Sequence, residues 1–165
     1  MAVLEILQYP NPRLRIKAAP VTVVDDALRA QVKDMVETMY AAKGVGLAAT
    51  QVDIHKQVFV MDVSETGDQH QCILNPEIIH REGTQYESEG CLSVDGAYDK
   101  VERALKVTLR GVDLNMQPLE IQAEGLMAVC FQHELDHLNG VLFIDHLSRL
   151  KQDRIRKKIS KANRE

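Results

Sequence analysis

The hydrophobic positions of the chain begin with a helical pattern. Between residues 26 and 42, apolar side chains recur at spacings of three and four and share one stripe of a helix. The stripe consists of Leu28, Val32, Met35, Val36 and Met39. Asp25 or Asp26 can cap the first turn, and Gly44 and Gly46 then end the helix and open a loop. We therefore predict an amphipathic helix that faces the core.

Short extended segments follow this helix. We predict strands over residues 57–62, 72–74, 77–80, 104–110 and 119–123. Turn-forming residues separate these segments at Asn75-Pro76, Glu82-Gly83, Gly111 and Gln117-Pro118. Because the connections are too short for crossover helices, several strands should be antiparallel neighbours.

Two more helices are predicted near the C-terminus. The first covers residues 125–138 and begins with an uninterrupted apolar run, 126–131, so it should pass through the interior. Gly140 follows as a stop. The second covers about residues 148–163, with Ser148 as its N-cap. This order predicts an α+β fold in which short, mostly antiparallel strands surround a buried helix, with a C-terminal helix.

Composition is consistent with one globular domain spanning residues 1–165. Hydrophobic residues make up 45% and charged residues 27%, which excludes a disordered, fibrous or membrane protein. The N-terminal sequence lacks the basic start and apolar run of a secretory signal, so we expect a cytoplasmic protein without a membrane partner.

The three cysteines are widely spaced and include no CxxC pair, which argues against a disulfide framework.

The charge is distributed unevenly. The net charge is −4, but residues 149–165 hold eight basic and two acidic side chains, which leaves −10 on residues 1–148. Only the C-terminal segment suits a polyanionic partner, and a basic run of this kind is more often a solvated helix face. We expect no DNA partner.

The strongest chemical motif lies in the buried helix. His133, Glu134 and His137 form an HExxH pattern, which places both imidazoles on one helical face where they can bind one ion. Glu134 is turned by about 100° from His133, where it can reach a water beside the metal without being a ligand. The pattern can arise by chance on a solvated helix, but an apolar helix makes that interpretation weak, because buried polar groups need partners.

A catalytic metal normally has three protein ligands, so the third ligand decides the class of enzyme. The peptidase pattern HExxHxxGxxH fails because Phe143 occupies the position of its last histidine. His146 is a weaker candidate, since it falls between two predicted helices and at no recognised spacing. Cys91 is the better one: a lone cysteine is usually an inert buried thiol, but this one lies in a glycine-marked segment between predicted strands, and a thiolate suits a metal.

Three segments now occur in a defined order along the chain. They are GVGLAATQ at 44–51, EGCLS at 89–93 and QHELDHLNG at 132–140. Together they resemble the three signature motifs of the peptide deformylases, and the similarity extends over nearly the whole chain, including YPNPRLR at 9–15. The resemblance implies a hydrolase that removes the N-formyl group from the formylmethionine of newly made polypeptides and releases formate.

The resemblance also implies roles for individual residues. Cys91, His133 and His137 correspond to the metal ligands of that family, and Glu134 to its catalytic acid/base. A bound metal lowers the pKa of water to about 7, and a carboxylate can then move the proton to the departing amine.

Further matching positions concern the substrate. Gln51 and the backbone N–H of Leu92 correspond to the groups that hold the oxyanion, although the ordinary interpretation of Gln51 is a loop-capping amide. The backbone of Val45 and Gly46 would line the substrate cleft, where an extended peptide can pair as an added strand.

Metal and partners also follow from the resemblance. The family commonly uses Fe²⁺, with Ni²⁺ and Co²⁺ as active substitutes and Zn²⁺ as a poorer one, whereas two imidazoles and a thiolate alone would suggest Zn²⁺. By analogy with similar bacterial enzymes, the basic C-terminal helix would dock on the ribosome. Lys43, Asp95 and Tyr98 depart from the common pattern of the family, which leaves open the peptide preference beyond methionine and a role as a secondary copy.

Two other functions compete with deformylation. One is a small metallopeptidase that uses the same water activation by Glu134. The other is a noncatalytic module that binds the ribosome or a peptide and contains a structural metal. A structural site would tolerate the loss of Glu134, whereas a catalytic one would not.

Overall fold

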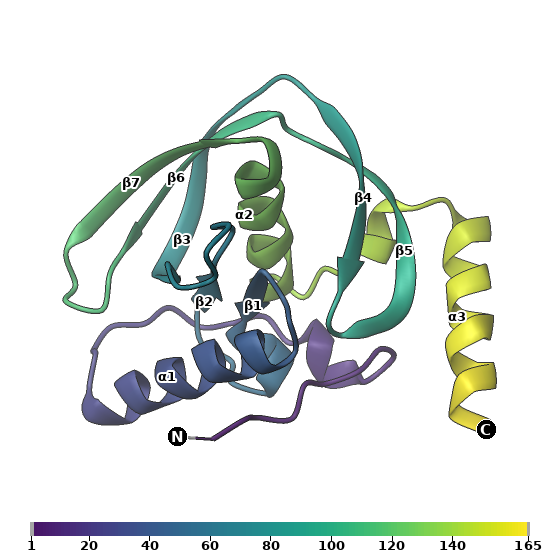
Figure 1. The fold of residues 1–165 in the computed structure, drawn as a ribbon, viewed down its shortest axis with the longest axis horizontal. Coiled ribbons are helices and arrows are strands. Elements are labelled where there is room, and N and C mark those ends of the chain that lie inside the picture. The colour runs from purple at the N-terminus through teal and green to yellow at the C-terminus, as the bar shows by residue number, and fades with distance from the viewer. Residues whose placement is uncertain (1, 165) are drawn as a thin grey trace.

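A computed structural model describes residues 2–164. Its main sheet is antiparallel, with the strand order β1-β2-β3-β6-β7, and β4 and β5 form a separate hairpin (Figure 1). The strands are β1 (Gly46–Ala48), β2 (Val58–Met61), β3 (Gln71–Glu82), β4 (Gln85–Cys91), β5 (Val94–Arg103), β6 (Lys106–Val112) and β7 (Pro118–Glu124). The helices are α1 (Asp26–Ala41), α2 (Gly125–Leu138) and α3 (Arg149–Arg164), with short 3₁₀ helices η1 (Pro12–Arg15), η2 (Ala49–Val52) and η3 (Phe143–His146).

Helices cover both faces of the five-stranded sheet. Along β2, Val58 and Val60 pack into the cluster that contains the apolar stripe of α1, whereas Phe59 and Met61 pack into the cluster that contains α2. All four side chains are at most 1% exposed. Because successive side chains of a strand point to opposite faces, this strand is apolar throughout. Helix α2 is thereby held in the interior, as its sequence predicted.

The three predicted helices are confirmed. Helix α1 begins after Asp25, whose carboxylate accepts a hydrogen bond of 2.8 Å from the backbone N–H of Leu28. It ends at Ala41, one residue earlier than predicted. Helix α2 has the predicted bounds, and α3 begins after Ser148, whose hydroxyl accepts from the backbone N–H of Lys151 at 3.3 Å.

The predicted strands are present, but two positions that were predicted to be turns lie inside strands. Residues 72–74 and 77–80 belong to the one strand β3, which is interrupted by a bulge at Asn75 with a φ of 51°. The Asn75 side chain accepts from the N–H of Val21 at 2.7 Å and donates to its carbonyl at 2.8 Å, which stabilises the bulge. Gly111 does not end β6 either, since it pairs with Leu119 of β7.

The hairpin of β4 and β5 was not predicted. Its first strand, QYESEGC, is mostly polar, and along β5 the buried apolar residues Val94, Ala97 and Val101 recur at spacings of three and four rather than two. The period of two that identifies a half-buried strand is therefore absent. The expectation that Cys91 lies between strands is wrong, because Cys91 is the last residue of β4.

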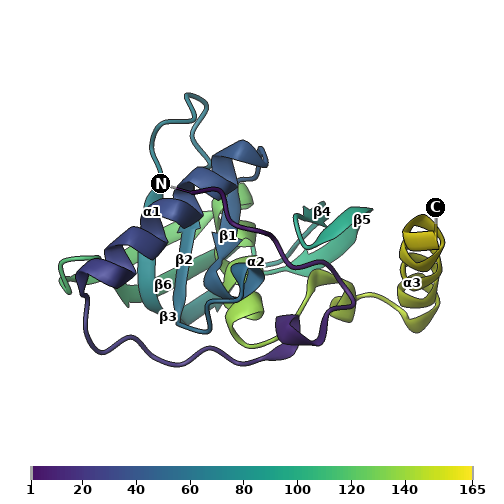
Figure 2. The ribbon, with the colours of Figure 1, turned by 90° about the horizontal axis from the view of Figure 1, so that it is seen from below.

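The hairpin forms a third core cluster with η1, η3 and α3. Helix α3 packs on it through Ile155 and through the Lys151 ammonium, 3.2 Å from the Asp99 carboxylate. Figures 1 and 2 show α3 at the outer edge of the molecule, beyond the hairpin. Within residues 2–164, no helix has the combination of length and apolar character that a membrane crossing requires.

Candidate metal centre

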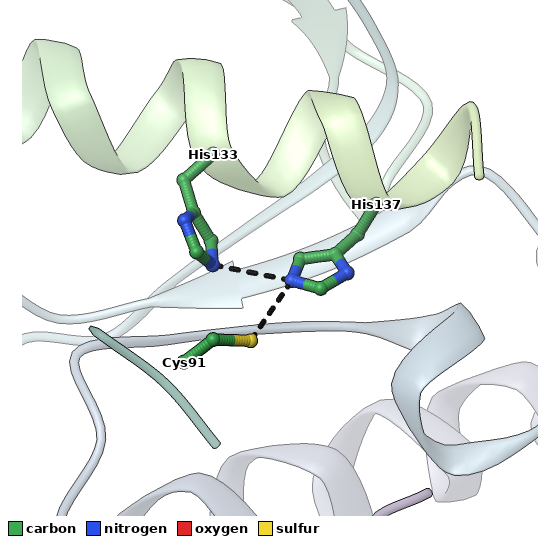
Figure 3. A group of neighbouring side chains, drawn as sticks. All are labelled: Cys91, His133 and His137. Carbon is green, nitrogen blue, oxygen red and sulfur yellow. Dashed lines mark hydrogen bonds between the residues drawn. The ribbon is translucent and has the colours of Figure 1, made fainter. Parts of the chain in front are cut away.

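Two histidines of α2 form one side of a buried metal site. His133 and His137 lie one helical turn apart and are 8% and 1% exposed. Their Nε2 atoms face each other at 3.1 Å (Figure 3). Burial and the neighbouring His133 lower the pKa of His137, so its imidazole stays neutral, which is the form that coordinates metals.

The third ligand atom comes from the hairpin. The Sγ atom of Cys91 lies 3.2 Å from Nε2 of His137, and all three ligand atoms are within 4.8 Å of one another (Figure 3). Tetrahedral coordination with ordinary metal–nitrogen and metal–sulfur bonds separates such atoms by roughly 3.3–3.6 Å. The donor set and its spacing therefore fit one divalent ion. Elsewhere in the described chain, no other group of His, Cys, Asp or Glu side chains meets this criterion.

A buried ion pair supports His133 from behind. Its Nδ1 lies 3.0 Å from the Glu89 carboxylate, which accepts two hydrogen bonds from the Arg103 guanidinium at 2.8 and 3.0 Å. Burial alone would raise the pKa of Glu89, but the hydrogen bonds from His133 and Arg103 lower it to about 2. The ionised carboxylate fixes the tautomer of His133 so that Nε2 is free to bind the metal.

The other candidate ligand, His146, lies outside the site. Its Nε2 is 2.8 Å from the Asp136 carboxylate, which in turn accepts a hydrogen bond of 2.6 Å from Arg103. Phe143, in the position where the peptidase pattern has its third histidine, stacks beside the His133 ring with centroids 6.3 Å apart. Neither residue supplies a metal ligand.

Glu134 is buried beside the ligands, at 3% exposure. Its Oε1 has no hydrogen-bond partner among the described residues, and burial raises the pKa of this carboxyl to about 7. A Cβ at Gly46 would clash with the other carboxylate oxygen and would lie 2.9 Å from Sγ of Cys130. Only glycine lets strand β1 pass so close to Glu134.

Gln51 connects the η2 segment to the hairpin turn. Its Oε1 accepts from the backbone N–H of Ala48 at 2.9 Å, which is the loop-capping role. Its Nε2 donates to the hydroxyl of Ser93 at 3.0 Å and lies 3.6 Å from Sγ of Cys91. Leu92 and Ser93 form the two-residue turn between β4 and β5. The amide of Gln51 is therefore next to the ligand sulfur.

A cleft of about 520 Å³ opens onto this site. It is lined by the predicted residues Val45, Gly46, Gln51, Cys91, Leu92, His133 and Glu134. Lys43, Asp95 and Tyr98, which the sequence resemblance marked as expected departures, also line it. His137 lies deeper, at 1% exposure. The same cleft therefore contains the reactive groups and the side chains that a longer peptide substrate could contact.

Arg103 was not among the site residues predicted from the sequence. Arg103 and Glu89 are fourteen positions apart, and only the register of the hairpin, in which Glu89 pairs with Asp99 and Arg103 with Gln85, brings them together. Because the hairpin itself was not predicted, no signal pointed to this pair. Removing one partner of a buried ion pair typically costs about 3–5 kcal/mol, so Arg103 supports the fold as well as the site.

Comparisons with known proteins agree with this site. The family model for polypeptide deformylase matches residues 3–153. The peptide deformylase of Chromobacterium violaceum is 53% identical over 165 residues, covering 100% of this chain and 99% of the relative. The crystal structure of the Legionella pneumophila peptide deformylase has a TM-score of 0.94 at 47% identity, covering 99% of this chain and 96% of that one.

A second solved structure spans the complete chain. The peptide deformylase of Ehrlichia chaffeensis, in complex with actinonin, is 40% identical with a TM-score of 0.95 and covers 100% of both chains. These matches confirm the family suggested by the three motifs. The chain belongs to the polypeptide deformylase family, the metal-dependent hydrolases that remove the N-formyl group from nascent polypeptides.

Proposed function

We propose that Cys91, His133 and His137 hold a catalytic Fe²⁺ and that Glu134 is the acid/base of deformylation. One observation carries the proposal most directly: Glu134 is 3% exposed, and its Oε1 has no hydrogen-bond partner among residues 2–164. Burying a carboxylate oxygen without a partner is costly unless the site uses it. A proton-transfer role beside three metal-binding atoms accounts for its position.

The chemistry divides between the ion and the protein. When bound, a divalent cation lowers the pKa of water and polarises the formyl group. Glu134 takes a proton from the attacking water and later delivers it to the amine nitrogen as the formyl C–N bond breaks, which yields formate and a free amino terminus. Burial raises the pKa of the Glu134 carboxyl in the metal-free protein, which favours a group that can both accept and return a proton.

Two donors would stabilise the oxyanion that develops on the formyl oxygen. The first is Nε2 of Gln51, which lies 3.6 Å from Sγ of Cys91. The second is the backbone N–H of Leu92, in the turn that follows Cys91. A donor of this kind typically contributes about 3–4 kcal/mol to catalysis.

The substrate would lie along strand β1. This strand is at one edge of the five-stranded sheet, and its first residue, Gly46, lies directly beside Glu134. Val45, just before it, is 47% exposed in the cleft. An extended peptide can pair with such an edge through backbone hydrogen bonds, which hold its formylated end near the metal ligands. Lys43 and Asp95 would then meet the residues that follow methionine.

Peptide hydrolysis is the main alternative reaction, and substrates distinguish the two. We expect formyl-Met-Ala-Ser to release formate, while the unformylated Met-Ala-Ser is left intact. Cleavage of internal peptide bonds in either compound, without formate, would favour the peptidase. Formate is quantified enzymatically, and the peptide products are separated by mass.

The choice of Fe²⁺ leads to an oxidation prediction. An iron-loaded sample should lose most of its activity on brief exposure to peroxide, because Fe²⁺ or the Cys91 thiolate is oxidised. A Ni²⁺-loaded sample of the same protein is the control. It should keep its activity in peroxide if the iron is the oxidised group, and it should lose activity if Cys91 is. Unchanged activity of the iron-loaded sample would contradict the assignment of iron.

The chain would act in the cytoplasm as one catalytic domain of residues 1–165, with α3 as a ribosome-docking helix. Eight basic side chains in residues 149–165 give this segment the charge that ribosomal RNA attracts. Deleting residues 150–165 should weaken binding to ribosomes at least tenfold, while the hydrolysis of formyl-Met-Ala-Ser continues. Sedimentation with ribosomes measures the first effect, and an unchanged affinity would contradict the docking role.

A further inference from the structure

We propose that the N-terminal segment Leu7-Gln8-Tyr9, here called the N-terminal brace, positions the two oxyanion donors, and that Gln8 is a positioning residue for deformylation. The inference rests on the proposed function, in which Gln51 and the N–H of Leu92 hold the oxyanion. The brace is a third segment, far from Gln51 and Leu92 in sequence, that holds the two donors at fixed positions relative to each other.

The brace holds the hairpin turn at two consecutive carbonyls. The side-chain amide of Gln8 donates to the carbonyl of Leu92 at 2.7 Å. The backbone N–H of Tyr9 donates to the carbonyl of Ser93, also at 2.7 Å. Fixing two successive carbonyls fixes the orientation of the peptide groups in the turn. The N–H of Leu92 belongs to the peptide group directly before them, so its direction is constrained as well.

The same segment holds the other donor. The backbone N–H of Leu7 donates to the carbonyl of Gln51 at 2.8 Å. Three consecutive residues therefore contact the η2 segment on one side and the β4–β5 turn on the other. Figure 2, which views the molecule from below, shows the N-terminal segment in the foreground, running from α1 past β1 towards the side of the β4–β5 hairpin. Apart from the Gln51 side chain itself, the brace is a direct link between the two donors.

This link matters because the donors come from different parts of the fold. Gln51 lies on η2, next to the main sheet, whereas Leu92 lies at the tip of a hairpin that is not part of that sheet. An oxyanion donor works only within about 2.7–3.1 Å of the developing charge, and a displacement of about 1 Å can cost two orders of magnitude in rate. A connection between the two parts preserves this distance.

A purely structural role is the competing explanation. Leu7 and Tyr9 also pack against the third core cluster, so replacing either would weaken the fold. Gln8 is exposed, and within residues 2–164 its side chain donates only to the Leu92 carbonyl, so replacing it tests positioning with little effect on packing. Exposed Gln117, which donates to the carbonyl of Asn115 at 3.5 Å in a distant turn, provides the matched control.

The experiment compares Gln8→Ala, Gln8→Glu, Gln8→Lys and Gln117→Glu in the metal-loaded full chain. The carboxylate of Gln8→Glu cannot donate and repels the Leu92 carbonyl, whereas the ammonium of Gln8→Lys can donate again. We expect kcat for formyl-Met-Ala-Ser to fall about 3- to 10-fold in Gln8→Ala and further in Gln8→Glu, with KM and the unfolding midpoint unchanged. Gln8→Lys should recover most of kcat, and Gln117→Glu should match the parent.

Hydrogen exchange gives a second measurement that does not depend on activity. The amides of residues 92–94 should exchange faster in Gln8→Ala and Gln8→Glu than in the parent or in Gln117→Glu. Unchanged kcat and unchanged exchange would overturn the proposal. So would a loss of kcat that follows a lower unfolding midpoint, because that result indicates a structural role.

A further variant separates this inference from the function on which it rests. If Gln51→Ala keeps full kcat, the oxyanion assignment fails, and the brace fails with it. If Gln51→Ala loses kcat while the Gln8 variants keep it, only the brace is refuted. A loss in both, with faster exchange of the turn in the Gln8 variants, supports both proposals.

Discussion

Replacing Glu134 with glutamine should lower kcat by about 10²- to 10⁴-fold while the metal stays bound. Glutamine keeps the shape of the side chain but cannot accept and return a proton. Glu134 lies beside the metal ligands but is not one of them, because the ligand group consists of Cys91, His133 and His137. The variant should therefore keep its ion. The measurement is formate release together with elemental analysis of the same sample.

The control for Glu134→Gln is Glu124→Gln. Glu124 is an exposed carboxylate that directly precedes α2, and its replacement should leave kcat unchanged. Near-normal turnover of Glu134→Gln with full metal content would contradict the acid/base role. That outcome is the one expected of a structural metal in a noncatalytic module.

Replacing Cys91 with alanine should abolish stoichiometric metal binding and with it the activity. Cys91 is the only ligand contributed by the hairpin, while both histidines come from α2. Its loss leaves two protein ligands, fewer than the three that catalytic sites normally use. Elemental analysis after dialysis should show well under one ion per chain, and the kcat of the dialysed protein should fall to background.

Stability should change in the same variant. An ion held by α2 and β4 binds only the folded chain, so it stabilises the protein by about 2.7 kcal/mol at a concentration 100 times its Kd. Chelation should therefore lower the unfolding midpoint of the parent and leave that of Cys91→Ala unchanged. Cys72→Ala is the matched control, because this partly buried thiol of β3 lies outside the cleft lining. Full metal binding by Cys91→Ala would exclude the thiolate ligand.

The helices and the HExxH pair could be predicted because their signals are local. The stripe of α1, the Asp25 cap and the apolar run of α2 each lie within a few turns of chain, and the structure reproduces their bounds to within one residue. The spacing of His133 and His137 on a helix already fixes their common face. No tertiary contact is needed for these conclusions.

The hairpin and the support of the site could not be predicted, because they depend on pairing between distant segments. Strand β4 has mainly polar residues and β5 has the wrong period, so neither shows the alternation of a strand. The Glu89–Arg103 pair and the Gln8–Leu92 hydrogen bond exist only after the hairpin is placed. The bulge at Asn75 likewise depends on Val21, 54 residues earlier. Residue chemistry and the motif resemblance both indicated Cys91, but neither could show what holds the thiol in place.

The most direct measurement is an anaerobic titration of the metal-free protein with Fe²⁺, with formate release from formyl-Met-Ala-Ser as the signal. We predict activity that rises linearly and stops rising at one ion per chain, because the structure groups one set of three ligand atoms in residues 2–164. Glu134→Gln should bind the same single ion and release almost no formate. Formate release without metal would exclude a catalytic ion, and equal turnover by Glu134→Gln would exclude Glu134 as the acid/base.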